Sequence, residues 1–141
     1  MEKITIRDGF ERMDFECVTR MLSQSYWCPG IEIEEVKRGA LNSALVVGAF
    51  LDQRKQIGYA RVISDKTRFA YILDVYVDEE YRRQGIGQQM IKHILAHDEL
   101  KSVYQWLLIT KNAHGVYGKA GFTPVSRPGD WMEIRHQRPD K

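Results

Sequence analysis

The chain has 141 residues, which is enough for one domain with its own core and too few for two ordinary domains. Its 43% hydrophobic and 28% charged residues are typical of a globular protein, and no stretch reaches the roughly 18 apolar residues that a membrane span needs. A net charge of only +2 disfavours a nucleic-acid partner, which usually requires a dense basic surface. We therefore expect a single domain over residues 1–141 that binds neither nucleic acid nor a membrane.

The two cysteines, Cys17 and Cys28, have neither the CxxC spacing nor the histidine neighbours of a metal site. The N-terminal sequence MEKITIRDGF has no apolar signal region. These features predict a cytoplasmic protein whose thiols lie in the core or in loops, without a bound metal.

The N-terminal third of the sequence predicts one strand and two helices. Residues 4–7 have strand composition, and apolar residues then recur at helical spacing through residues 14–25. Pro29 and Gly30 interrupt this pattern, and residues 32–41 predict a second helix.

Three strands are predicted next. The segments SALVVGAFL and QIGYARVIS are rich in β-forming residues and are separated by the short polar link DQRK, which favours an antiparallel hairpin. FAYILDVYV, at residues 69–77, is the most apolar β-prone segment and predicts a central strand.

The C-terminal half begins with a helix from Ile86, whose apolar residues fall on one face. We expect a strand at residues 103–110, a short helix at 113–120 and two final strands in FTPV and WMEIR. The expected order is βααβββαβαββ, a mixed α/β or α+β fold.

The sequence RRQGIG, residues 82–87, joins the predicted central strand to the amphipathic helix. A helix N-terminus presents unpaired N–H groups, and glycines allow a phosphate to approach the main chain, so Gly85 and Gly87 suit a pyrophosphate site. The spacing matches neither a P-loop nor a GxGxxG dinucleotide motif. Arg82, one turn ahead, can add a charged contact. The alternative is that the two glycines only permit a tight turn.

This stretch resembles the acyl-CoA signature Q/R-x-x-G-x-G/A of the GCN5-related N-acetyltransferases (GNAT family). A second family signature, A-x-x-Φ-Y-x-x-x-G-F with Φ apolar, is matched by Ala113, Val116, Tyr117, Gly121 and Phe122. Both occur in the family's order and element context. The sequence departs from the family at Thr110, where the family often has asparagine, and at Glu79, where it often has proline.

The resemblance implies a mostly antiparallel sheet of about seven strands flanked by about four helices. It also implies that the central strand and the strand at 103–110 splay apart around the pantetheine arm of acetyl-CoA, with main-chain groups of Val75 and Val77 pairing with it. The cofactor-binding residues it implies are Val75, Tyr76, Val77, Arg82, Arg83, Gln84, Gly85, Ile86, Gly87, Gln88 and Thr110.

The family reaction is direct attack of an amine on the thioester. Deprotonating a lysine-like amine at pH 7 costs about 4.6 kcal/mol, so a general base would assist the reaction. Asp74 and His114 are the candidates for this base. The alternatives are that Asp74 only pins a backbone group or an arginine, and that His114 is a surface or capping residue. Tyr117 is the expected hydrogen-bond or proton donor to the leaving sulfur; the alternative is simple packing beside the cofactor.

Tyr26, Trp27 and Trp131 are candidates for the wall of the acceptor site, where aromatic rings suit a cationic or apolar amine; the alternative is that they belong to the core. The leading hypothesis is therefore an acetyl-CoA-dependent N-acetyltransferase for a small primary amine. A non-catalytic acyl-CoA-binding module and an interaction protein in which RRQGIG is only a turn are the rivals. A homodimer is compatible with the resemblance, because the family often dimerises.

Overall fold

The computed structural model describes residues 3–139, and its centre is a five-stranded sheet. The first four strands pair antiparallel with their sequence neighbours, and the fifth runs parallel to the fourth. In order across the sheet, the strands are β1 (Ile4–Asp8), β2 (Leu45–Leu51), β3 (Lys55–Ser64), β4 (Phe69–Val77) and β5 (Gln105–Leu107).

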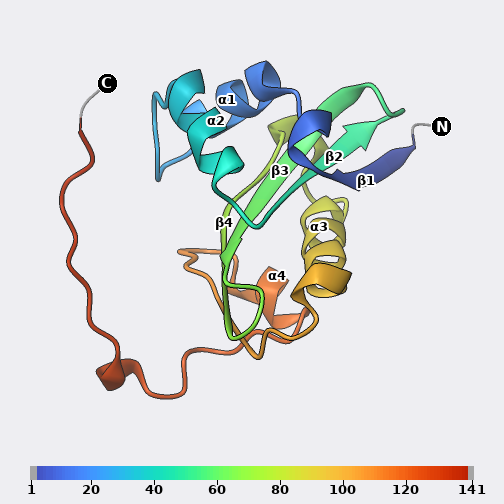
Figure 1. The fold of residues 1–141 in the computed structure, drawn as a ribbon. Helices are drawn as coiled ribbons and strands as arrows, with labels where there is room; N and C mark the ends of the chain where they lie inside the picture. The colour runs from blue at the N-terminus through green and yellow to red at the C-terminus, as the bar shows by residue number, and fades with distance from the viewer. Residues whose placement is uncertain (1–2, 140–141) are drawn as a thin grey trace.

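Helices cover both faces of this sheet (Figure 1). They are α1 (Phe15–Ser23), α2 (Ile33–Leu41), α3 (Ile86–Leu95) and α4 (His114–Gly118). The α1 helix begins at Asp14, whose side chain accepts a hydrogen bond from the Cys17 amide and thereby caps the helix. No helix within residues 3–139 is long and apolar enough to cross a membrane.

Two cores, one on each face, hold the helices to the sheet. One core packs α3 residues such as Met90 and Ile94 against Ile57 of β3. The other packs the apolar sides of α1 and α2, including Val18 and Val36, against the opposite face. Cys17 and Cys28 are free thiols buried in this second core, as the sequence predicts. The sheet is thereby fixed from both sides, which holds the strand ends at defined positions.

The predictions for β4 and α3 are confirmed, and β4 spans the predicted residues 69–77. The seven-strand expectation is wrong, because the described residues form five strands. The strand predicted at 103–110 covers only residues 105–107. FTPV and WMEIR form no strand, and the helix predicted at 113–120 is shortened to α4. A strand needs a partner edge to satisfy its backbone, and the last segment lies outside the sheet.

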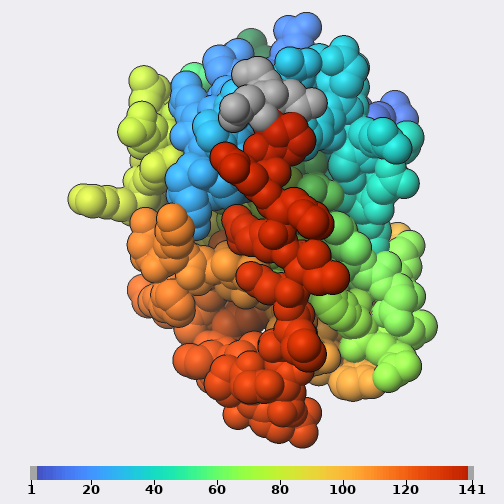
Figure 2. Space-filling model, turned by 90° about the vertical axis from the view of Figure 1, so that its left-hand side faces the viewer, coloured from blue at the N-terminus to red at the C-terminus, as the bar shows by residue number. Residues whose placement is uncertain are grey.

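The chain after Phe122, which we call the C-terminal segment, is irregular except for a 3₁₀ turn at Pro128–Asp130. It runs along the surface as an extended chain (Figure 2, red). Near its end, the Arg138 guanidinium donates two hydrogen bonds to the Glu35 carboxylate of α2, at 2.7 and 2.8 Å. This bidentate pair ties the segment to α2.

Candidate active site

A hollow of about 800 Å³, which we call the β4–α3 hollow, opens between the end of β4 and the start of α3. Its walls come from residues 75–77 of β4, from most of the turn and first helical residues at 82–88, from the loop at 24–27 and from α4 with its flanking residues. Four separate parts of the chain therefore meet at one site.

The hollow exists because β4 and β5 separate. Their pairing covers only Phe69 to Tyr71 of β4, opposite Gln105 to Leu107. Beyond this point β4 continues without β5 beside it, and its register with β3 shifts between Tyr59 and Arg61. Asp74, at the shift, has a φ of +56°, which is uncommon for a residue other than glycine and is typical of functional sites. The main chain at residues 75–77 thus faces the hollow along an edge that β5 does not cover.

The glycine turn forms the other end of the hollow. Gly85 is the N-cap of α3 with a φ of +78°, and no side chain caps the helix there. The amides of the first helical turn therefore keep their donor capacity, at the positive end of the helix dipole. A Cβ atom added to Gly87 would have only Val77 Cγ2 nearby, at 4.0 Å, and one added to Gly85 would meet nothing within that distance. This space and these donors fit the phosphates of a nucleotide.

The arginines and glutamines around this turn have different surroundings. Arg82 donates from Nε to the Val77 carbonyl at 2.8 Å, and its guanidinium carbon lies 4.9 Å from the centre of the Tyr76 ring. These contacts hold the Arg82 guanidinium in place beside the hollow that it lines. Gln88 donates to the Val116 carbonyl at 2.9 Å and so connects α3 to α4. Arg83 lines the hollow, whereas Gln84 does not.

Tyr117 of α4 lines the β4–α3 hollow and is half-buried. Its ring meets that of Phe122 edge to face, with centroids 6.0 Å apart. Burial, and to a smaller extent the nearby Tyr26, raise the pKa of Tyr117 above its ordinary value. The hydroxyl is therefore protonated at neutral pH, the state needed to donate a hydrogen bond.

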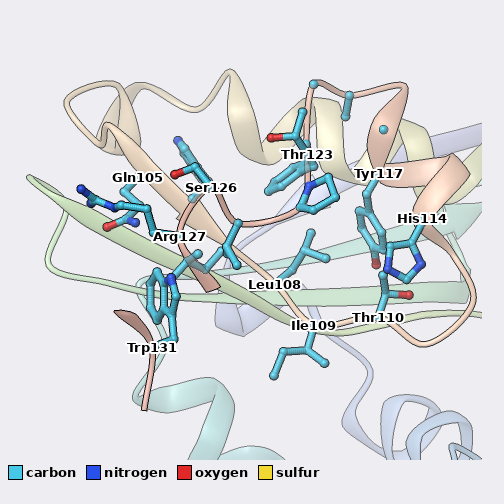
Figure 3. Close-up of a pocket in the computed structure, with 18 of the residues that line it drawn as sticks. Gln105, Leu108, Ile109, Thr110, His114, Tyr117, Thr123, Ser126, Arg127 and Trp131 are labelled. Atoms are coloured by element: carbon cyan, nitrogen blue, oxygen red, sulfur yellow. The ribbon is translucent and has the colours of Figure 1, made fainter. Parts of the chain in front are cut away.

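A second hollow, of about 1010 Å³, lies between β5 and the C-terminal segment; we call it the β5 hollow. Tyr117, His114 and Thr110 lie at one of its ends and Trp131 at the other (Figure 3). His114, Thr110 and Trp131 line this hollow and not the β4–α3 hollow. Thr110 accepts a hydrogen bond from the Ala113 amide through Oγ1 at 3.1 Å, just before α4. Of the predicted site residues, only Tyr117 borders both hollows.

Asp74 has a partner on each carboxylate oxygen. Arg61 Nε lies 2.7 Å from Oδ2, and the Trp27 indole donates to Oδ1 at 2.8 Å. The Asp74 side chain is only 12% exposed and that of Arg61 18% exposed. Asp74 thus connects β3 and β4 to the loop between α1 and α2. These contacts match the alternative of a carboxylate that pins an arginine.

We expect Asp74→Asn to lower the free energy of unfolding by about 1–3 kcal/mol, because Arg61 would lose its charged partner in a poorly hydrated place. Denaturant unfolding measures this loss. Glu99→Gln is the matched control: Lys66 lies at the same 2.7 Å from Glu99, but both side chains are largely exposed. Glu99→Gln should lower the free energy of unfolding by less than about 1 kcal/mol. Equal costs for the two variants would contradict the anchoring role.

Tyr26 and Trp27 form an aromatic edge of the β4–α3 hollow. Their rings are nearly perpendicular, with centroids 4.9 Å apart, and both are solvent-accessible. The Lys111 ammonium lies 4.7 Å from the centre of the Tyr26 ring. Sequence reasoning missed Lys111, for which no local pattern gives a signal. It also missed Arg61, although a charge within an apolar strand is the same signal that identified Asp74.

The described residues contain no group of three or more histidine, cysteine or acidic side chains placed to hold a metal ion. The site is built from directed amides, aromatic rings and the half-buried carboxylate of Asp74. It can bind an anionic ligand at one end and present a tyrosine hydroxyl in the middle.

A model of the acetyltransferase (GNAT) domain matches residues 43–124. Among proteins of curated function, none matches the chain. Among solved structures, a protein from Xanthomonas campestris pv. campestris described as belonging to the GNAT family is 34% identical, with a TM-score of 0.88; the alignment covers 95% of this chain and 94% of that one.

Two further structures are similar. A GNAT-family acetyltransferase from Streptococcus pneumoniae is 25% identical, with a TM-score of 0.73 and coverage of 98% of this chain and 100% of that one. A Clostridium acetobutylicum protein crystallised with acetyl-CoA is 18% identical and shares the fold, with a TM-score of 0.70 and coverage of 94% and 96%.

Proposed function

Because the chain belongs to the GNAT acetyltransferase family, we propose that it transfers the acetyl group of acetyl-CoA to a primary amine of a small molecule. The observation that carries this proposal is the β4–α3 hollow, where the uncapped N-terminus of α3, the open edge of β4 and Tyr117 meet. An anion site, a strand edge and a proton donor are the three features that a CoA thioester and its leaving sulfur require.

Residues 85–87 would hold the pyrophosphate of CoA and residues 75–77 its pantetheine amides. The fit rests on the free space at Gly87 and on the absence of a side-chain cap at Gly85. The acetyl-CoA found with the C. acetobutylicum protein, which has the same fold, supports acetyl-CoA as the ligand. Acetyl-CoA supplies a thioester carbonyl that a neutral amine can attack. The main-chain N–H of Val75, beside the irregular Asp74, is the proposed donor to the carbonyl oxygen.

Tyr117 is the proposed donor to the sulfur. A raised pKa makes its hydroxyl a weaker acid than an ordinary tyrosine, so full proton transfer to a thiolate with a pKa of about 8.5 is uphill. Its contribution is then a hydrogen bond that stabilises the departing sulfur. This predicts a modest rather than a dominant effect on turnover.

The two base candidates differ in availability. Asp74 already has Arg61 and Trp27 as partners, so we assign it the positioning of Trp27. His114 is exposed, and its side chain has no hydrogen-bond partner among residues 3–139, although it lines the β5 hollow. We keep His114 as the proposed base, one helical turn before Tyr117.

The amine would enter past Tyr26 and Trp27. Lys111 already places a cation at the Tyr26 ring, so a second cation there meets repulsion. This favours an acceptor that approaches as the neutral amine, the form that attacks the thioester.

The direct test measures CoA thiol release from acetyl-CoA with a panel of primary amines: a polyamine, free amino acids, an amino sugar and a lysine-containing peptide. We expect amine-dependent thiol release and an acetylated product by mass spectrometry for at least one small amine. Saturable binding of acetyl-CoA without turnover for any amine would contradict the enzymatic proposal and favour a binding module.

A further inference from the structure

The Lys111 ammonium joins two loops that border the β4–α3 hollow. It lies 4.7 Å from the centre of the Tyr26 ring. Lys111 belongs to the loop between β5 and α4, whereas Tyr26 belongs to the loop between α1 and α2. The Thr110 hydroxyl accepts a hydrogen bond from the Ala113 amide, which holds the first of these loops in a bend around Lys111. The contact sets a positive charge at the entrance past which the acceptor amine would pass.

This charge has no acidic partner in the described part of the chain. None of the ion pairs formed within residues 3–139 includes Lys111. The Tyr26 ring attracts the ammonium through its π electrons, but it carries no net charge and does not neutralise it. An ammonium also has three N–H donors, and the ring cannot satisfy all of them. Lys111 can therefore bind an anion that arrives from solvent.

Two acidic groups adjoin the loop between α1 and α2, and each is already bound to an arginine. Asp74 contacts the loop through the Trp27 indole and is paired with Arg61 at 2.7 Å. Glu35 lies in the first turn of α2, directly after the loop, and accepts two hydrogen bonds from Arg138. Neither carboxylate is thus in place to neutralise the ammonium at the entrance.

The wall of the β4–α3 hollow is also mainly cationic. Its charged residues are Arg82, Arg83, Lys119 and Glu79. The two arginines belong to the turn proposed for the phosphates of CoA, so a ligand balances their charge there. Lys119 follows α4, and with Lys111 it places two ammonium groups on the α4 side of the hollow. An acceptor with a negative charge is attracted to this side, and one with a second positive charge is repelled.

The Tyr26 ring connects the entrance to the proposed sulfur donor. Tyr26 and Tyr117 both line the β4–α3 hollow. Burial raises the pKa of Tyr117, and Tyr26 adds to this effect, so the two side chains are electrostatic neighbours. An acceptor whose amine reaches the thioester beside Tyr117 therefore extends past Tyr26. Its far end would lie at Lys111.

We propose that Lys111 binds a carboxylate of the acceptor, so that the substrates of this site are small primary amines that carry a carboxylate, such as free amino acids. This inference rests on the proposed acetyltransferase function and adds the substrate class to it. A carboxylate matches the single charge of Lys111 and accepts its N–H donors in charge-assisted hydrogen bonds. Diamines and polyamines place a second ammonium at the same point, and the like charge selects against them.

Steady-state kinetics with paired acceptors tests the proposal. Each pair is a free amino acid and its carboxamide, which have nearly the same size and differ in charge. With the wild-type chain the amino acid should have the lower KM. Lys111→Gln should raise the KM for the amino acid about five- to tenfold and that for the carboxamide less than about twofold, as for the loss of one partly exposed charged hydrogen bond. Each ratio compares two proteins with one acceptor, so the pKa of the amine cancels.

Two further variants serve as controls. Lys111→Arg keeps the charge and should keep the preference for the amino acid. Lys55→Gln removes a lysine whose ammonium lies over another tyrosine ring, 5.5 Å from the centre of Tyr81, and Lys55 lines neither hollow. This variant should keep both KM values within about twofold of wild type. A wild-type chain that does not distinguish the two acceptors, or equal effects of Lys111→Gln on both, would overturn the proposal.

A binding measurement separates this inference from the proposed function. The chain is saturated with CoA and titrated by calorimetry with an N-acetyl amino acid and with its amide. We expect the carboxylate to bind more tightly, and Lys111→Gln to remove the difference. If the difference is found but no amine is acetylated, the proposed function fails and the carboxylate site stands. If amines are acetylated and neither affinity nor KM depends on Lys111, the carboxylate site fails and the proposed function stands.

Discussion

Replacing Gly87 with glutamate is expected to weaken acetyl-CoA binding about 100-fold or more, whereas glutamine at the same position should weaken it less than about tenfold. Gly87 lies in the first turn of α3, and an added side chain would begin at the floor of the β4–α3 hollow beside Val77. Two like charges about 4 Å apart near a protein surface repel by about 4 kcal/mol before screening. A 100-fold loss corresponds to about 2.7 kcal/mol and lies within that repulsion.

Calorimetric titration of both variants with acetyl-CoA measures this difference. The two side chains have nearly the same size, so the comparison isolates the charge. An acidic residue in the first turn of a helix is also favourable for the helix, so Gly87→Glu should remain folded, and circular dichroism checks this. Equal affinities of the glutamate and glutamine variants for acetyl-CoA would show that its phosphates do not bind at this turn.

The second effect is expected on turnover: Tyr117→Phe should lower kcat about 10- to 100-fold, the modest loss that follows from removing one hydrogen bond to the sulfur, while leaving the dissociation constant of acetyl-CoA unchanged. The phenylalanine ring keeps the contact with Phe122 and loses only the hydroxyl. Because burial raises the pKa of Tyr117, the hydroxyl is protonated throughout the neutral range. The ratio of wild-type to variant kcat should therefore be constant between about pH 6 and 9.

Tyr104→Phe serves as the matched control. Tyr104 is 72% exposed and lines neither hollow, and its hydroxyl accepts a hydrogen bond from Arg68. This variant should keep kcat within about twofold of the wild-type value, because the substitution lies at the surface. If Tyr117→Phe weakens acetyl-CoA binding as much as it lowers kcat, Tyr117 acts by packing. If kcat is unchanged at every pH, the hydroxyl takes no part in the reaction.

The sequence predicts the central elements of the fold well because their signals are local. β4 is a continuous apolar run, and α3 has an unbroken apolar face next to a glycine turn, so both are recognised without knowledge of their neighbours. The strand expected at WMEIR has equally good local composition. Whether it forms a ladder depends on which edge it meets, and no pattern within the segment contains that information.

The same distinction holds for the site. Gly85, Gly87 and residues 75–77 line one hollow because they lie close together in the sequence, at the end of one strand and the start of the next helix. The partners of Asp74 come from elsewhere: Arg61 is 13 residues away and Trp27 is 47. The resemblance to the family motif predicts that Thr110 lies near the cofactor. In the structure it bonds the Ala113 amide and lines the β5 hollow.

The central claim is that the uncapped N-terminus of α3 and the open edge of β4 bind acetyl-CoA. Calorimetric titration of the purified wild-type chain with acetyl-CoA, with CoA in parallel, tests it most directly. The claim predicts saturable binding of both ligands at one site per chain. A folded sample that gives no binding heat with either ligand, and no protection from thermal unfolding, would contradict it.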